Sequence, residues 1–417
     1  MLVGAVGGLG GFQVVRSSAA SGGSADARTT DEATATVADD GTVAVTGITL
    51  PGQEVELPAD CEAKTSQAAR VVCTANAFLG TLSAEQQAEV LLSLTQENAV
   101  RWSNFPSPFG ERNGIQLGTL DETQLAAALA VLKVALGTLE NEGYSETMQI
   151  RMADDVIALF DDSANAGGQS GGAGRMSGGA GGPPDGAAPA SGGAGGSAAG
   201  GAVTFSSASY YLAFLGTPST TGTWTLQFGG HHLAVNMTYE AGKVVSATPY
   251  HTGVEPTAWT AEETTYSPLS SDHQGMVALL ASLSEEQLTS AKLSQTFSDV
   301  LLGPGQDGQF PETKSGIKVS DLSDAQRALV LAAMKPWVQD ADAETAAELV
   351  ALYENELSET YISFSGDPSL SKLADYVRID GPSVWIELAC QSSDISGIHY
   401  HTIWRDHERD YGAQYSF

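Results

Sequence analysis

Two histidines alternate near the carboxyl end of the sequence, in the triplet His399-Tyr400-His401. Residues two apart on a β-strand point to the same face, so these two imidazoles can chelate one metal ion. The triplet Tyr250-His251-Thr252 matches Tyr400-His401-Thr402, and an adjacent pair, His231-His232, precedes both. Imidazole ligands are typical of zinc, copper, nickel or iron sites rather than magnesium or calcium sites. We therefore predict a transition-metal site, of unassigned metal, whose ligands are His251, His399, His401 and His232.

A different class of protein remains open at this point. A single histidine on a strand is more often a hydrogen-bonding structural residue than a metal ligand. In a non-enzymatic ligand-binding or structural module, all of these histidines would only donate and accept hydrogen bonds. Their clustering favours the metal site, and the separation of the imidazoles distinguishes the two hypotheses.

Two carboxylates are candidates for the chemistry beside these imidazoles. Glu387 lies on the strand before His399, and a hairpin turning through Ser392 to Gly397 would place it opposite His401. A carboxylate there can bind the metal, orient an imidazole or act as a general base. Glu255, four residues after His251, is the second candidate, with a turn before Pro256 as its alternative role.

Arg405 and Asp406 follow the histidine triplet on the same strand. A His-x-His pair followed by an acidic residue is similar to the first metal motif of cupins, but the usual glutamate is absent and the preceding spacing differs. We take Glu387, Asp406 and Arg405 as the candidate catalytic residues.

A polar and aromatic segment contains the candidate substrate-binding residues Arg101, Trp102 and Arg112. Arginine and a stacking indole can bind an anionic or sugar-like molecule. The same side chains can instead fix a loop to the core.

The elements that must position these residues occur twice in the sequence. Four capping-box signatures predict helix starts at Ser83, Asp121, Ser284 and Ser323, each with a glutamine three residues later. They form two pairs of nearly equal spacing, and the second helix of each pair follows a similar phrase, Gly114-Ile115-Gln116-Leu117 or Gly316-Ile317-Lys318-Val319. The helix pairs therefore look like copies.

The strand segments repeat as well. The run from Tyr211 to Ser219 parallels the run from Tyr361 to Ser369, and the two Tyr-His-Thr triplets follow at equal distances. We predict an α+β fold from an internally duplicated unit, a helix pair plus β-hairpin strands, with the copies packed pseudo-symmetrically. The imidazoles of His251 and His401 should then lie within about 8 Å of each other at the junction, with His399 on the same side.

The predicted boundaries follow from composition. Residues 1–60 comprise a signal-like apolar segment and a low-complexity stalk or peripheral strand, and residues 61–417 form the duplicated domain. Copy one covers residues 61–256 and contains a flexible Gly-rich insert at 165–201, and copy two covers 270–417. Cys61 and Cys73 can close a disulfide in an oxidising compartment, while Cys390 fits a core-facing strand position. A secreted or cell-envelope location is expected.

The net charge excludes one class of partner. The sequence has 19 Lys and Arg against 50 Asp and Glu, a net charge of -31, so it would repel a nucleic-acid backbone. Beyond the amino terminus, no apolar run approaches the roughly 20 residues of a membrane span. A small-molecule or surface ligand is the expected partner.

Several long phrases also resemble a known family. They include Leu226 to Leu233, His251 to Pro256, Arg378 to Glu387 and His399 to Asp406. Together they are similar to an uncharacterised, mostly bacterial family, the domain of unknown function numbered 3500. The resemblance covers roughly Cys61 to Tyr411 and implies no activity. From the residues themselves we predict a secreted metal-binding protein, a metalloenzyme in preference to a non-enzymatic module, of unassigned reaction.

Overall fold

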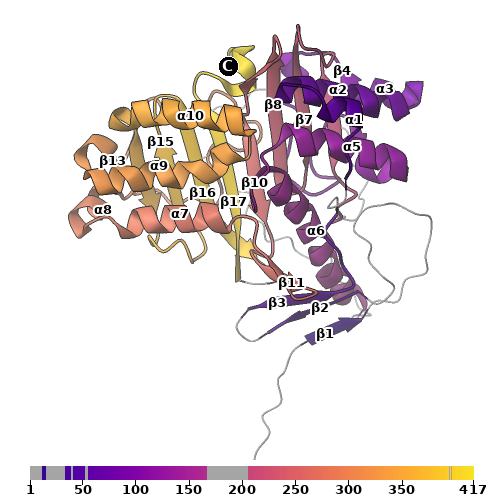
Figure 1. Ribbon diagram of the computed structural model, residues 1–417. Helices are drawn as coiled ribbons and strands as arrows, with labels where there is room; N and C mark the ends of the chain where they lie inside the picture. The colour runs from indigo at the N-terminus through magenta and orange to yellow at the C-terminus, as the bar shows by residue number, and fades with distance from the viewer. Residues whose placement is uncertain are drawn as a thin grey trace, which may run out of the picture.

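The computed structural model describes residues 12–15, 33–38, 41–51, 55–166, 205–393, 395 and 397–417. The fold is α+β, with one large mixed sheet, a second small sheet and helices (Figure 1). Most of the predicted signal-like segment and nearly all of the predicted Gly-rich insert lie outside the described residues. The first two residues of that insert, Asn165 and Ala166, belong to the end of a helix.

The large sheet has twelve strands, and two strands from distant parts of the chain meet at its centre. The order along the sheet is β13-β14-β15-β16-β17-β10-β8-β7-β6-β4, while β5 pairs with β6 and β9 with β8. The strands are β4 (Leu91–Leu92), β5 (Ile115–Gln116), β6 (Tyr211–Leu215), β7 (Thr223–Gly230), β8 (Leu233–Glu240), β9 (Lys243–Ser246), β10 (Tyr250–Val254), β13 (Ile317–Lys318), β14 (Tyr361–Ser365), β15 (Tyr376–Asp380), β16 (Val384–Ser393) and β17 (Gly397–Asp406).

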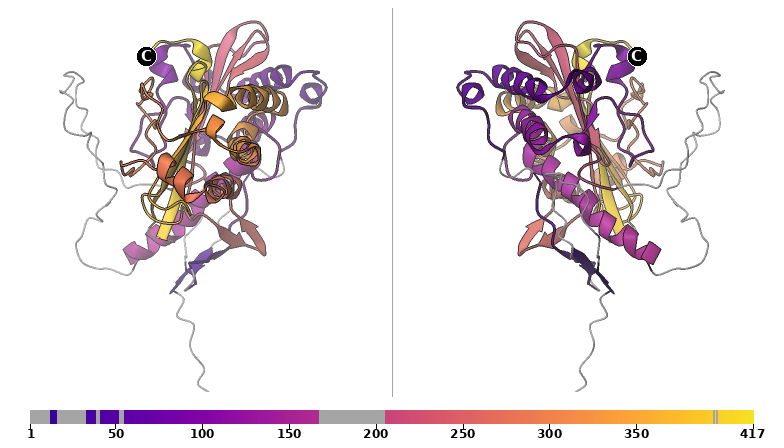
Figure 2. Two further views of the ribbon diagram at one scale, coloured as in Figure 1. Left: turned by 90° about the vertical axis from the view of Figure 1, so that its left-hand side faces the viewer. Right: turned by 90° about the vertical axis from the view of Figure 1, so that its right-hand side faces the viewer.

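Helices cover one face of this sheet, and long connections cover the other (Figure 2). The α-helices are α1 (Ala59–Glu62), α2 (Gln67–Thr81), α3 (Ala84–Val90), α4 (Gln96–Ala99), α5 (Glu122–Ala135), α6 (Gly143–Ala166), α7 (Ser270–Ala281), α8 (Glu285–Ala291), α9 (Asp324–Gln339) and α10 (Ala343–Glu356). Short 3-10 turns occupy Leu117–Thr119, Val319–Asp321, Leu357–Glu359 and Asp410–Ala413. Within the described residues, none of the helices combines the length and apolar character needed to cross a membrane.

All four predicted helix starts are confirmed. Ser83, Asp121, Ser284 and Ser323 each accept a hydrogen bond from the backbone of the glutamine three residues later, whose side chain bonds back to the cap. These glutamines also join the helices in pairs, Gln86 with Gln124 and Gln287 with Gln326. A short sequence signal thus fixes both a helix start and a contact between helices.

The strands β10 and β17 have one face toward the helices and one face toward the long connections. Trp404 and Thr402 face the helices, where Trp404 donates to the Tyr353 hydroxyl at 3.2 Å and Thr402 accepts from the Trp337 indole at 3.0 Å. Because side chains alternate on a strand, residues 399, 401, 403 and 405 point to the other face. That face is covered by the segments 93–114 and 292–316, which contribute Trp102, Phe297 and Val300 to a separate apolar cluster.

The predicted stalk or peripheral strand joins a second sheet, of order β1-β2-β3-β11-β12. Its strands are β1 (Phe12–Val15), β2 (Thr34–Val37), β3 (Val43–Thr46), β11 (Trp259–Ala261) and β12 (Thr264–Tyr266). Ala35, Val43 and Val45 are buried in one cluster with Trp259 and with residues of α6. This part of the amino-terminal segment therefore packs against the body of the protein.

The cysteines behave as their positions indicate. Cys61 and Cys73 form a disulfide between α1 and α2. Cys390 is a free, buried residue of β16, in the apolar core with Ile386 and Leu388. Burial raises the pKa of its thiol to about 12, so Cys390 is a packing residue.

Candidate metal centre

Three imidazoles from two distant parts of the chain meet on the loop-covered face. His399 and His401 come from β17, and His232 comes from the turn between β7 and β8. One side-chain nitrogen from each lies within 4.8 Å of the others. The ring centroids of His232 are 5.2 Å from His399 and 5.1 Å from His401. The expectation that His399 and His401 share a face is confirmed, and His232 joins them.

The free nitrogens of His399 and His401 point at each other. Nδ1 of His399 donates to the carbonyl of Ser392 at 2.8 Å, and Nδ1 of His401 donates to Asp299 at 2.9 Å. In the neutral tautomers that carry their protons on Nδ1, the two Nε2 lone pairs face each other at 3.2 Å. Two nitrogens bound to one tetrahedral zinc at 2.0–2.1 Å stand roughly 3.3 Å apart. The pair is therefore spaced as two ligands of one ion.

The protonation states also suit a cation. Burial, followed by the charges of the neighbouring histidines, lowers the pKa of His232 and of His399 well below the usual range. Burial alone would raise the pKa of Asp299, but its contacts with His401 lower it to about 2. Neutral imidazoles that donate to a carbonyl or a carboxylate are the usual arrangement of metal-bound histidines.

Local backbone features make room for the cluster. His232 has φ 62, in the left-handed region that few residues with a side chain adopt, and its N–H donates to the carbonyl of Asn104 at 3.0 Å. Gly253 on β10 pairs with His401, and a Cβ there would lie 3.0 Å from the His401 ring and 3.1 Å from the His232 ring. A glycine at 253 therefore lets both rings lie against the strand.

His251 lies beside the three without joining them. Its ring centroid is 5.4 Å from that of His401, which confirms the expectation of about 8 Å or less. The side chain is fully buried, and burial lowers its pKa to about 3. Among the described residues, neither of its ring nitrogens has a well-formed hydrogen bond. Leaving buried ring nitrogens without well-formed hydrogen bonds is costly, and this imidazole contacts the ring of His401.

A histidine–aspartate pair borders the cluster. Nδ1 of His231 lies 2.7 Å from Oδ1 of Asp154 on α6, and the Tyr210 hydroxyl donates to the other oxygen of Asp154 at 3.0 Å. The rings of His231 and His232 are stacked with centroids 3.6 Å apart. Strand alternation would send these neighbours to opposite sides, but they occupy a two-residue turn, so both point toward the site.

The segment with the candidate substrate-binding residues holds the site in place. Arg112 donates to the carbonyls of Ser103 and Phe105 and, at 3.0 Å, to that of Gly230, beside His231. The Trp102 indole donates to the Tyr411 hydroxyl at 2.7 Å. Arg101 pairs with Glu97 at 2.7 Å on the surface. A cavity of only about 10 Å³ lies among these side chains, about the space of one water molecule. These contacts correspond to the alternative role, fixing the loop.

The predicted register that placed Glu387 opposite His401 is wrong. Ala389 faces His401, and Glu387 faces Ile403, because the hairpin turn is centred one residue later than assumed. The buried Glu387 carboxylate accepts hydrogen bonds from the backbone of Leu301 and Leu302, the Trp385 indole and the Tyr376 hydroxyl. Burial raises its pKa, although these four donors oppose the increase. Glu387 thus fastens the segment 292–316 that carries Asp299.

Arg405 is fully buried on the same face. It donates to the carbonyls of Leu302 and Gly303 and pairs with Asp307 at 3.0 Å and Asp410 at 2.9 Å. Its guanidinium carbon lies 5.5 Å from the centre of the Trp102 ring. Arg405 therefore ties together the two segments that cover the site.

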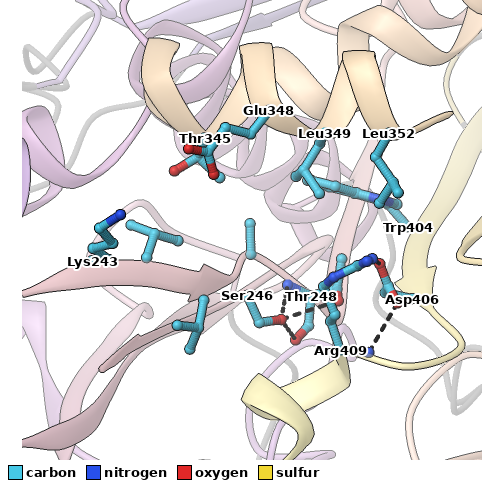
Figure 3. A pocket seen from close by; sticks show the side chains of 13 residues that line it. Lys243, Ser246, Thr248, Thr345, Glu348, Leu349, Leu352, Trp404, Asp406 and Arg409 are labelled. Atoms are coloured by element: carbon cyan, nitrogen blue, oxygen red, sulfur yellow. Dashed lines mark hydrogen bonds and ion pairs between the residues drawn. The ribbon is translucent and has the colours of Figure 1, made fainter. Parts of the chain in front are cut away.

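Asp406 was expected near the histidines, but it lies on the other face of the sheet. It is an odd number of residues from His401, so strand alternation turns it toward the helices. There it borders a cavity of about 380 Å³ between β9, β17 and α10, also lined by Lys243, Glu348 and Arg409 (Figure 3). Its carboxylate caps the backbone of Glu408 and Arg409 and pairs with the Arg409 side chain at 2.7 Å.

Sequence reasoning missed two acidic residues of the site. Asp299 lies in an irregular segment far from any histidine in the sequence, and Asp154 lies on a helix. Both reach the imidazoles only through tertiary packing, so spacing carries no signal for them. Glu255 was foreseen, and one of its carboxylate oxygens is 3.6 Å from Nδ1 of His399.

The fold and the site together define a class, an α+β protein whose central sheet carries a buried histidine cluster under two long connections. The chain belongs to the protein family of unknown function DUF3500, whose model matches residues 64–413. This agrees with the resemblance found in the sequence. No curated protein and no solved structure has significant similarity to the chain.

Proposed function

We propose that this protein binds one transition-metal ion through His232, His399 and His401. The observation that carries the proposal is the 3.2 Å approach of the His399 and His401 Nε2 atoms, with both Nδ1 atoms bonded away from the site. Three imidazoles leave a tetrahedral ion one position for water or substrate, as in catalytic zinc sites. Zinc, copper, nickel and iron all suit this donor set.

The arrangement favours a metalloenzyme over a structural site. An ion held here would supply Lewis acidity or a bound water of lowered pKa. The His231–Asp154 pair lies against His232, and its imidazole, oriented by the carboxylate, has the form of a general base. About a tenth of the side-chain surface of His399, His401 and His231 is exposed, so the cluster is in contact with solvent.

The competing function is a non-enzymatic module in which the histidines only hydrogen-bond. The buried His251 counts against it, because neither of its ring nitrogens forms a well-formed hydrogen bond among the described residues, as a purely hydrogen-bonding role would require. The two functions predict different metal contents.

Elemental analysis of the full chain, purified without a histidine tag, tests the proposal. We expect about one equivalent of a single transition metal, either as isolated or after reconstitution with zinc, copper, nickel or iron salts. Less than about 0.2 equivalents of every one of these metals after reconstitution would contradict the proposal and favour the binding module.

Asp299→Asn should weaken the metal without removing it. The amide can still accept from His401 but lacks the negative charge that strengthens the imidazole as a ligand, so we expect about 10–100-fold lower affinity. Competition with a chromophoric chelator measures this. Glu97→Gln, an exposed partner of Arg101, is the matched control and should leave the affinity unchanged. If Asp299→Asn binds the metal as tightly as Glu97→Gln does, Asp299 does not contribute to the metal site.

We further propose that the site lies at the junction of two copies of one unit. Thr252 and Thr402, equivalent in the two repeated triplets, are direct partners in the β10–β17 ladder, and their hydroxyls are 2.7 Å apart. The strand order outward from this pair, β17-β16-β15-β14 and β10-β8-β7-β6, supports the proposal. The Cys61–Cys73 disulfide supports a secreted or cell-envelope location, since disulfides persist in oxidising compartments.

A further inference from the structure

A group of buried carboxylates lies on the helix-covered face of the same sheet. Glu142 precedes α6, Glu146 lies in the first turn of α6, and Asp340 follows α9. One oxygen from each lies within 4.8 Å of the others. Their relative exposures are 6%, 1% and 1%, and Asp272 on α7, at 1%, is close enough that its charge affects the pKa of Glu142. Surface acids are common without a ligand, but these are in the interior.

The protein provides few partners for these charges. Asp340 accepts from the Gly143 N–H at 2.7 Å, and Glu142 accepts from the Ser271 hydroxyl at 2.7 Å. The other Glu142 oxygen and Oε2 of Glu146 are buried without a hydrogen bond. Within the part of the chain that the structure describes, no lysine, arginine or histidine forms an ion pair with Glu142, Glu146 or Asp340. Buried charges are normally paired or bound to a metal.

A separate buried polar side chain lies near the group. Tyr250 on β10 is 1% exposed, and its hydroxyl, which lies near Thr147, forms no well-formed hydrogen bond among the described residues. Burial, then the charges of Asp340 and Glu146, raise the pKa of this phenol, which places it beside them. A buried hydroxyl without a well-formed hydrogen bond, near carboxylate oxygens that also lack one, favours a shared partner for all of them.

We propose that Glu142, Glu146 and Asp340 bind a calcium ion where the start of α6 meets the end of α9. A set of oxygens alone selects a hard cation, and calcium accepts six to eight oxygens in irregular geometry, whereas magnesium requires a near-ideal octahedron. Carboxylates on two sides of the group, the α5–α6 link and the α9–α10 link, would then be cross-linked by one ion. The site is independent of the histidine cluster, because Tyr250 and His251 point to opposite faces of β10.

Protons are the alternative means of neutralising this group. Burial, followed by neighbouring carboxylates, raises the pKa of Glu142 to about 10, and burial raises that of Asp272 to about 7. Since the folded state then holds protons that the unfolded chain releases above about pH 4.5, the calcium-free protein loses stability as the pH rises from about 5 to 8. Calcium should reverse this loss by displacing the protons.

Calorimetric titration of CaCl₂ into full-length, EGTA-treated protein at pH 7.5 tests the site, together with thermal unfolding. We expect one bound calcium per chain and a rise in Tm that equimolar MgCl₂ does not reproduce. Imidazoles do not select calcium, so the result does not depend on the transition-metal site. No heat of binding, together with the same fall of Tm between pH 5 and 8 with and without calcium, would overturn the proposal.

Two variants locate the ion. Glu146→Gln keeps the side-chain shape but removes a buried charge, so the calcium-free variant should be more stable than the natural protein at pH 8, with at least tenfold weaker calcium binding. Glu354→Gln, on the exposed face of α10, is the control and should bind calcium as the natural protein does. If Glu146→Gln proves too unstable to measure, Asp272→Asn should give a smaller change of the same sign. If Glu146→Gln and Asp272→Asn both bind calcium as tightly as the natural protein, the ion binds elsewhere and the proposal is wrong.

Discussion

The His401→Phe variant is expected to lose the transition metal. Phenylalanine fills the space of the imidazole but offers no nitrogen, so two of the three close ligands remain and the chelating pair with His399 is lost. Because removing an outer partner of a metal-bound histidine already costs about 10–100-fold, removing the ligand itself should weaken affinity more than about 100-fold. Metal content after dialysis and chelator competition measure the change.

Two matched variants sharpen this test. His273→Gln alters a histidine that lies outside the cluster and bonds to the carbonyl of Leu370, so its metal content should equal that of the natural protein. His251→Phe should weaken the metal less than His401→Phe, because His251 stands behind the three close imidazoles. Equal losses for His251→Phe and His401→Phe would instead indicate a closed, four-imidazole site without an open position.

Gly253→Ala changes the site without replacing a ligand. The added methyl group would lie 2.9 Å from the carbonyl oxygen of Tyr400 on β17 and 3.0 and 3.1 Å from the rings of His401 and His232, so the backbone of β17 and both rings would have to shift. Metal geometry tolerates little displacement, so this shift of the two rings should weaken metal binding.

What the sequence predicts correctly here is mostly local. A capping box needs only two residues three apart, so all four helix starts were found, each with its glutamine. The alternation of Ile386, Leu388 and Cys390 likewise identified one buried face of a strand. The approach of His251 and His401 was also predicted, because the repeated triplets indicated equivalent positions beside one junction.

What it predicts poorly depends on turns and on packing. One residue in the position of a hairpin turn changed the partner of His401 from Glu387 to Ala389. Asp406 shows a different limit, since proximity in sequence suggested a shared site although strand alternation places it on the opposite face. Asp299 and Asp154 reach the cluster through the segment 292–316 and through α6, and no pattern in the sequence joins those segments to β17.

The structure also changes how the candidate catalytic residues are understood. Glu387 and Arg405 meet at adjacent peptides, where Glu387 accepts from the N–H of Leu302 and Arg405 donates to the carbonyl of the same residue. Both therefore hold the segment that carries Asp299 against the sheet. In this interpretation they act on the metal only by positioning its surroundings.

Arg405→Ala should show this role as a large loss of stability. The substitution leaves Asp307 and Asp410 without their buried partner and frees two carbonyls, and removing one member of a buried ion pair costs about 3–5 kcal/mol. Urea unfolding measures the change. Arg101→Ala, which removes an exposed pair, should cost no more than about 1 kcal/mol.

The metal content of the folded Arg405→Ala protein distinguishes positioning from catalysis. If Arg405 acts through the covering segments, the free energy of unfolding falls and metal affinity falls with it, because Asp299 is held less firmly against His401. If Arg405 contacts the substrate instead, the variant should unfold at the same urea concentration as the natural protein and retain its metal. The buried guanidinium, with two carboxylates and two carbonyls around it, leads us to expect the first result.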